Sequence, residues 1–176
     1  MEIFAIGHST KPLEDFVALL KAHGIETLAD IRTVPKSRYN PQFNQDRLAL
    51  ELPRVGIRYV HLKNLGGLRH ARPDSQNLGW ENPGFRGYAD YMQTETFAAA
   101  LNELIELGAQ SRISLMCAEG NPARCHRNLL ADALTVRGVT VLHISSRKSA
   151  HPHKLTPFAL VEGTRVTYPG SQPNLL

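Results

Sequence analysis

The chain has 176 residues, of which 42% are hydrophobic and 20% are charged, an ordinary balance for one globular domain. No apolar run approaches the roughly 20 residues that a membrane-spanning helix needs, and the first residues lack the basic region of a secretion signal. The two cysteines cannot build a disulfide framework. We therefore expect a cytoplasmic protein with no membrane partner.

The net charge of +4 is unevenly distributed. Residues 32–72 carry nine Lys or Arg against two acids, and residues 112–154 carry seven against two, whereas residues 73–111 carry one against six. The two basic segments favour convergence on an anion, either a phosphate group or a nucleic-acid backbone. A solvated surface of uneven charge is the alternative.

Strand and helix signals alternate along the chain. In chain order they predict a strand at 2–6, a helix at 13–23, a strand at 26–31, a helix at 46–55, a strand at 57–62, a long helix within 88–107, a strand at 112–117, a helix at 122–137 and a strand at 139–144. This alternation predicts the α/β class, a three-layer Rossmann-like domain with a mainly parallel sheet of about five strands.

We expect a single domain over residues 1–176, with a core of residues 1–148 and a C-terminal extension of residues 149–176. Four prolines interrupt the extension. Two arrangements are open for it: a short hairpin around Gly163, or a segment that lies over the surface.

In open α/β sheets, ligands bind outside the carboxyl ends of the strands. The segments of interest are therefore those that follow the predicted strands, residues 7–10, 32–40, 63–87, 118–124 and 145–148. Two of the connecting loops are long, and long loops in a compact domain are often lids or binding loops.

The densest group of reactive side chains follows the fourth predicted strand. Asn121 and Pro122 are typical of a helix start, so an exposed helix amino terminus that suits an anion is expected there. These features predict a lowered pKa and a nucleophilic role for Cys117, with a packed core cysteine as the alternative. Six residues separate Cys117 from Arg124, one more than in a phosphatase loop, so that mechanism is not predicted.

Three further residues are candidates for proton transfer. His126 falls on the apolar face of the predicted helix, where it points toward the sheet or is a core histidine bonded to a backbone carbonyl. Glu119 is a general base, an orienting group or a surface acid. His8 would face Cys117 and Glu119 if the first and fourth strands are neighbours. Cys125, at the edge of the helix face, is expected to pack.

Basic and aromatic side chains in the same loops are candidates for substrate binding. Arg32 and Arg38 suit an anion, because arginine forms bidentate pairs with phosphate, whereas Asp30 paired with an arginine would be structural. Arg86 lies near two aromatic residues that offer a stacking surface for a base. Ser9 alternatively caps the first helix. The full candidate set is Ser9, Asp30, Arg32, Arg38, Arg86, Tyr88 and Arg127.

No cofactor and no metal ligand are predicted. The cysteines and histidines lack the paired spacing of structural zinc sites, although a bound zinc is left open. No glycine-rich dinucleotide fingerprint follows the first strand, which favours hydrolysis or group transfer over redox chemistry.

Several motifs in order resemble the bacterial and archaeal family called domain of unknown function 488. They are Ile6–Thr10, Asp30-Ile31-Arg32 with Pro35 and Ser37-Arg38, Leu65-Gly66-Gly67, Phe85–Met92, Met116–Glu119 and Cys125-His126-Arg127, with Tyr168-Pro169 near the end. The resemblance spans residues 3 to about 170. It implies a compact α/β fold and a cytoplasmic protein, and it implies no reaction.

The favoured hypothesis is a hydrolase or group transferase that acts on a phosphorylated or nucleotide-like small molecule. A nucleic-acid-binding module is the first alternative, supported by the basic segment 32–72 with Tyr39, Phe43 and Tyr59. A non-catalytic scaffold built on a buried polar network is the second. The oligomeric state is left open.

Overall fold

The computed structural model describes residues 1–171, and its elements follow the predicted alternation. In chain order they are β1 (Glu2–Gly7), α1 (Leu13–Ala22), β2 (Thr27–Asp30), α2 (Gln45–Arg54), β3 (Arg58–His61), α3 (Pro83–Tyr91), α4 (Glu95–Gln110), β4 (Ile113–Cys117), α5 (Arg127–Thr135), β5 (Thr140–Ile144), β6 (Ala150–Pro152), β7 (Leu160–Glu162) and β8 (Arg165–Thr167). Short 3-10 turns lie at Pro41–Phe43, Lys63–Leu65 and Pro122–Arg124.

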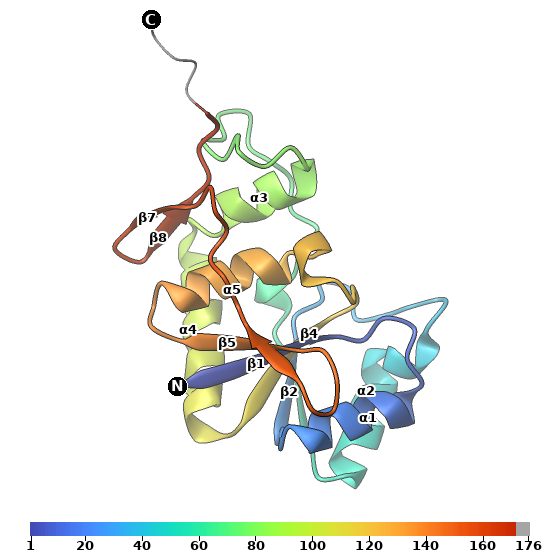
Figure 1. Ribbon diagram of the computed structural model, residues 1–176. Helices are drawn as coiled ribbons and strands as arrows, with labels where there is room; N and C mark the ends of the chain where they lie inside the picture. The colour runs from blue at the N-terminus through green and yellow to red at the C-terminus, as the bar shows by residue number, and fades with distance from the viewer. Residues whose placement is uncertain (172–176) are drawn as a thin grey trace, which may run out of the picture.

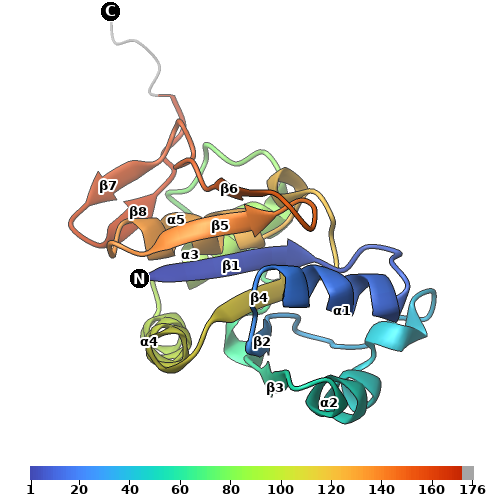
Figure 2. The same ribbon diagram turned by 60° about the horizontal axis from the view of Figure 1, so that its bottom comes forward.

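The sheet has six strands in the order β3-β2-β4-β1-β5-β6 (Figure 2). The first five are parallel, and β6 is antiparallel to β5. The predicted α/β class and mainly parallel sheet are confirmed, and the arrangement is consistent with a Rossmann-like fold. The sixth strand was not predicted, because three residues that end in a proline carry no alternating pattern.

Helices cover both faces of the sheet, α1 and α2 on one side and α4 and α5 on the other (Figure 1). Alternate residues of β1 serve the two layers, as the period of a strand requires. Ile3 and Ala5 pack with α4 and α5, whereas Phe4 and Ile6 pack with α1 and α2.

Two predicted helices have different bounds in the structure. The long helix expected within 88–107 is two helices, α3 and α4, and the Thr94 hydroxyl accepts the Phe97 N–H at 3.2 Å to begin the second. The helix expected from residue 122 begins at Arg127. Asn121 caps only a 3-10 turn there, accepting the Ala123 N–H at 3.0 Å.

The C-terminal extension adopts the hairpin, one of its two expected arrangements. Strands β7 and β8 are antiparallel, and Gly163 at the turn has a φ of +64°. Val166 and Tyr168 are buried beside α5. Residues 172–176 of the extension lie outside the described residues. Over residues 1–171, no helix has the length and apolarity to cross a membrane.

The strand order determines where a ligand can enter. Strands β1 and β4 are neighbours, yet the chain leaves β1 toward α1 and leaves β4 toward α5, on opposite faces of the sheet. A crevice forms outside the carboxyl ends of neighbouring strands whose connections diverge in this way.

Candidate active site

A cavity of about 420 Å³ lies at the carboxyl ends of β1, β2 and β4. Five of the candidate residues that the sequence assigned to this edge line the cavity: His8, Arg32, Cys117, Glu119 and His126. We call it the thiol cavity, because Cys117 and Cys125 both line it. The remaining walls include Gly67 and Phe85, from the loop before α3 and from α3 itself.

Other candidate residues lie elsewhere. Tyr88 is fully buried and donates its hydroxyl to the Leu65 carbonyl at 2.9 Å, so it supports the wall from behind. Arg86 donates to the Trp80 carbonyl at 2.9 and 3.1 Å. Arg38 is exposed and does not line the cavity.

Three candidate residues sit behind or beside the thiol cavity. Ser9 adopts a φ of 50° and donates its backbone N–H to the Ala118 carbonyl at 2.9 Å. Asp30 is buried beneath Arg32. Arg127 lines a different cavity, described below.

A glycine brings two of the loops into direct contact. A Cβ atom at Gly7 would collide with the carbonyl oxygen of Glu119. The next backbone N–H, of His8, donates to the Cys117 carbonyl at 2.9 Å and so extends the pairing of β1 with β4. The expectation that His8 lies beside Cys117 depended on these two strands being neighbours, and they are.

Arg32 is held in place by a bidentate pair with Asp30. Its Nε and Nη2 atoms donate to the two carboxylate oxygens at 2.9 and 2.7 Å, and Nη2 also donates to the Phe43 carbonyl at 2.6 Å. Asp30 accepts a further hydrogen bond from the Tyr59 hydroxyl. The remaining nitrogen, Nη1, is 3.4 Å from His8 Nε2 and is the part of Arg32 left for a ligand.

His8 is a neutral histidine in this setting. Its Nδ1 donates to the Ser9 carbonyl at 2.7 Å, which leaves a lone pair on Nε2 toward Arg32. Burial is the largest cause that lowers its pKa to about 4, and the Arg32 charge adds to it. The ring stacks on Phe43 with centroids 4.2 Å apart. These contacts suit His8 to positioning better than to proton transfer near pH 7.

His126 and Cys125 lie in contact in the wall of the thiol cavity. The Nε2 atom of His126 lies 3.2 Å from the Ile31 carbonyl, and a carbonyl only accepts, so Nε2 carries a hydrogen. The lone pair of the neutral ring is then on Nδ1, which is 3.6 Å from the Cys125 sulfur. A proton passed from Cys125 to Nδ1 gives a thiolate beside an imidazolium.

The two cysteine sulfurs lie 2.9 Å apart in this cavity. The Cys117 sulfur is also 3.4 Å from the Glu119 carbonyl oxygen, which can only accept, so the single Cys117 thiol hydrogen is shared between this oxygen and the Cys125 sulfur. The Cys125 sulfur accepts the Arg127 N–H at 3.4 Å, a contact that favours a thiolate. We therefore assign the proton to Cys117 and the charge to Cys125.

The pKa directions agree with this assignment. Hydrogen bonding with Cys117 is the largest cause that lowers the pKa of Cys125 to about 4, with further lowering by His126 and by the Arg127 N–H. The pKa of Cys117 is raised well above its usual value, first by the bond to Cys125 and then by burial. The prediction of a lowered pKa at Cys117 is therefore wrong. Because α5 begins at Arg127, its amino terminus acts on Cys125 instead.

The rim of the thiol cavity is basic. Lys36 and Arg124 are exposed lining residues, and Glu119 is the acid that lines the cavity with them. Neither Lys36 nor Arg124 was a candidate, although both lie in the basic segments that the charge distribution had singled out. The Glu119 carboxylate accepts the Asn121 N–H at 3.2 Å and remains open to solvent.

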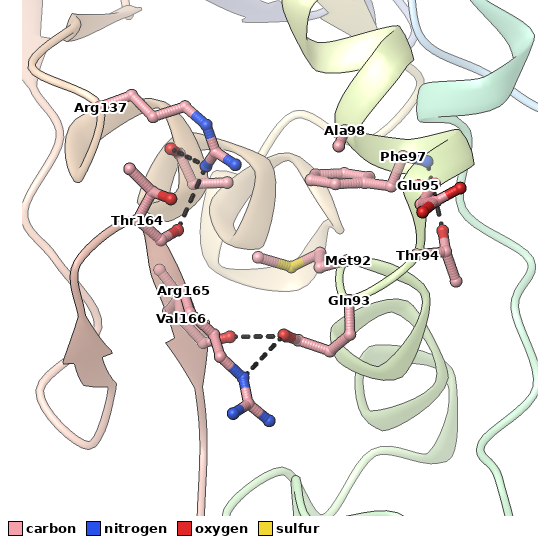
Figure 3. Close-up of a pocket in the computed structure, with 11 residues that line it drawn as sticks. Met92, Gln93, Thr94, Glu95, Phe97, Ala98, Arg137, Thr164, Arg165 and Val166 are labelled. Atoms are coloured by element: carbon pink, nitrogen blue, oxygen red, sulfur yellow. Dashed lines mark hydrogen bonds between the residues drawn. The ribbon is translucent and has the colours of Figure 1, made fainter.

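A smaller cavity of about 230 Å³ lies between the start of α4 and the hairpin, and it has a structural explanation (Figure 3). Gln93 donates to the Val166 carbonyl at 2.8 Å and accepts from Arg165 at 3.2 Å. Arg137 donates to the carbonyls of Ala133 and Thr164 at 2.9 and 3.4 Å. These bonds attach the hairpin to the helical layer.

Within residues 1–171, no three or more His, Cys, Asp or Glu side chains converge as a metal site. No curated protein and no solved structure matches the chain. A family model does match, over residues 12–134, a span that includes Arg32, Cys117, Cys125 and His126 and leaves out His8. The chain therefore belongs to the family described as Domain of unknown function DUF488.

Proposed function

We propose that this protein is a hydrolase or group transferase that uses the Cys125 thiolate as its nucleophile. The observation that carries the proposal is the position of the Cys125 sulfur, beside His126 Nδ1 and the first N–H of α5, in the wall of a cavity. Reactive cysteines occur in electropositive, partly accessible surroundings of this kind.

The chemistry follows from the neighbours of the sulfur. In the first step, sulfur bonds to a phosphoryl or acyl group while the bond to the leaving oxygen breaks, and the His126 imidazolium gives that oxygen its proton. In the second step, water or an acceptor hydroxyl loses a proton to His126, bonds to the transferred group and releases the Cys125 thiolate. Glu119 lines the same cavity and is placed to orient the attacking water.

The basic rim favours an anionic substrate. Lys36, Arg124 and the free edge of Arg32 surround the thiol cavity, and a volume of about 420 Å³ lies within the range for small-molecule sites. A phosphorylated or nucleotide-like molecule fits this charge and size.

Trapping the covalent intermediate tests the proposal. Aryl phosphates and aryl esters are mixed with the protein, quenched in acid and examined by intact mass and peptide mapping. We expect an adduct on Cys125 that is absent from Cys125→Ser and present in the matched Cys117→Ser variant. An adduct on Cys117, or one that persists in Cys125→Ser, would contradict the proposal.

A second candidate function is the binding of single-stranded nucleic acid. Tyr39 is 88% exposed, in the same loop as Lys36 and Arg38, and an aromatic ring among cations suits base stacking with phosphate contacts. The other two aromatic residues expected to help do not, because Phe43 is buried and Tyr59 donates to Asp30.

The salt dependence of oligonucleotide binding tests this second function separately from the thiol chemistry. Binding of a short oligonucleotide should weaken steeply with added salt, and Tyr39→Ala should weaken it more than Leu68→Ala, an exposed apolar residue at the rim of the thiol cavity. No binding at low salt would eliminate this candidate and leave the thiol chemistry untouched.

A further inference from the structure

A second large cavity, of about 440 Å³, lies outside the carboxyl ends of β1 and β5. Its lining includes Lys11, Gly120, Arg127, His143, Ser145 and His151. It shares no lining residue with the thiol cavity, because the loop after β4 presents Ala118 and Glu119 to one cavity and Gly120 and Pro122 to the other. We call it the Arg127 cavity.

Within residues 1–171, Arg127 is buried without a counter-charge. The residue is 2% exposed, and the one hydrogen bond that its side chain makes to these residues goes from Nη2 to the Gly120 carbonyl at 3.1 Å. Over the described part of the chain, Nε and Nη1 find no partner, and no carboxylate forms an ion pair with this guanidinium. A buried charge is costly unless an opposite charge and hydrogen bonds satisfy it.

A buried histidine relay ends at the same cavity. The Asp132 carboxylate accepts from the Tyr168 hydroxyl and from His153 Nε2, both at 2.7 Å, so His153 carries its hydrogen on Nε2. His153 Nδ1 lies 3.0 Å from His143 Nε2, and with His143 as the donor of this bond the hydrogen of His143 is on Nε2. The lone pair of His143 is left on Nδ1, a buried atom with no partner among residues 1–171.

The environment keeps His143 in this neutral form. Burial is the largest cause that lowers its pKa to about 4, and the Arg127 charge adds to it. The cavity wall therefore combines guanidinium donors with one fixed acceptor. A group that matches both has a negative charge and one hydroxyl hydrogen, as hydrogenphosphate does.

We propose that the Arg127 cavity is a second ligand site, which binds the phosphate of a small phosphorylated molecule or of inorganic phosphate. Arg127 takes the anionic oxygens and His143 Nδ1 accepts the P–OH hydrogen, while Lys11 adds charge at the mouth. Sulfate has the same shape but no hydrogen to give, so the site should discriminate against it. This proposal does not depend on the thiol chemistry.

Calorimetric titration of the full chain with inorganic phosphate tests the proposal. We expect saturable binding near neutral pH, weakened about tenfold or more in Arg127→Met. Lys11→Met should also weaken binding and serves if Arg127→Met fails to fold. His143→Phe should remove the preference for phosphate over sulfate.

The matched control is Arg124→Met, which alters an arginine of the thiol cavity and should leave phosphate affinity unchanged. Absence of saturable phosphate binding would overturn the proposal. So would binding that Arg124→Met abolishes and Arg127→Met preserves, because the anion would then occupy the thiol cavity. Cysteine adduct formation is a separate readout, so failure of one proposal is distinguishable from failure of the other.

Discussion

Arg32 and Arg127 are both buried, yet their surroundings differ. Arg32 meets the Asp30 carboxylate in a bidentate pair, and most of its donors are committed to the protein. Arg127 meets no carboxylate among the described residues and has two nitrogens without partners. Arg32 and its acid organise the site around them, whereas the uncompensated charge of Arg127 is costly and is the basis for the anion site that we propose.

The largest expected effect is a difference in the free energy of unfolding between variants of these two arginines. Arg32→Met should lower the free energy of unfolding by about 3–5 kcal/mol, because Asp30 would be left buried without its cation. Arg127→Met should leave that free energy unchanged or raise it, because no buried acid loses its partner. Denaturant unfolding of both variants measures the contrast, and equal losses would contradict it.

The loop that separates the two cavities offers a second test. Gly7→Ala would force a Cβ into the Glu119 carbonyl. It should lower the free energy of unfolding by about 1–3 kcal/mol and disturb both cavities. Gly120→Ala is the matched control, because a Cβ there meets only the Ser9 side chain, at 3.4 Å or more. Equal free energies of unfolding for the two variants would show that the close approach at Gly7 is not what joins the loops.

A smaller effect compares one histidine from each cavity. His8 and His143 both have their pKa lowered to about 4, against about 6.5 in an unfolded chain. The unfolded state thus binds more protons between these values, so stability is complete above about pH 6.5 and falls as the pH drops toward 4.

Thermal unfolding across this pH range measures that loss. His8→Gln and His143→Gln should each flatten the fall, because each removes one such histidine. The effect is additive if the cavities are independent. A fall that neither variant alters would contradict the neutral state assigned to both rings.

Much of the fold and of the thiol cavity was predictable from the sequence, because both depend on local periodicity and on parallel strands that end at one edge of the sheet. The short apolar run at residues 2–6 predicts strand β1, and the polar segments after β1, β2 and β4 converge as expected. The lowered pKa of Cys125 was not predicted, because the expected helix start was misplaced. Asn121 and Pro122 form a good capping signal, but the turn they begin is a 3-10 turn that ends before Cys125.

Local sequence patterns do not predict the Arg127 cavity. Its relay joins Asp132 in α5 to His153 after β6 and to Tyr168 after the hairpin, so three distant segments supply it. The sequence assigned Arg127 to the same cleft as Arg32, because residue order does not reveal which side of a loop a side chain takes. The structure places the two arginines in different cavities.

The most direct test of the central claim is the pH dependence of iodoacetamide alkylation at each cysteine, followed by peptide mass spectrometry. With its pKa lowered to about 4, Cys125 should react at a nearly constant rate between about pH 5 and pH 8, and Cys117 should remain unmodified. In Cys117→Ala, loss of the hydrogen bond should raise the pKa of Cys125 and slow its reaction at the acidic end. Preferential alkylation of Cys117, or a Cys125 rate that falls about tenfold per pH unit below pH 8 like that of an ordinary thiol, would contradict the account.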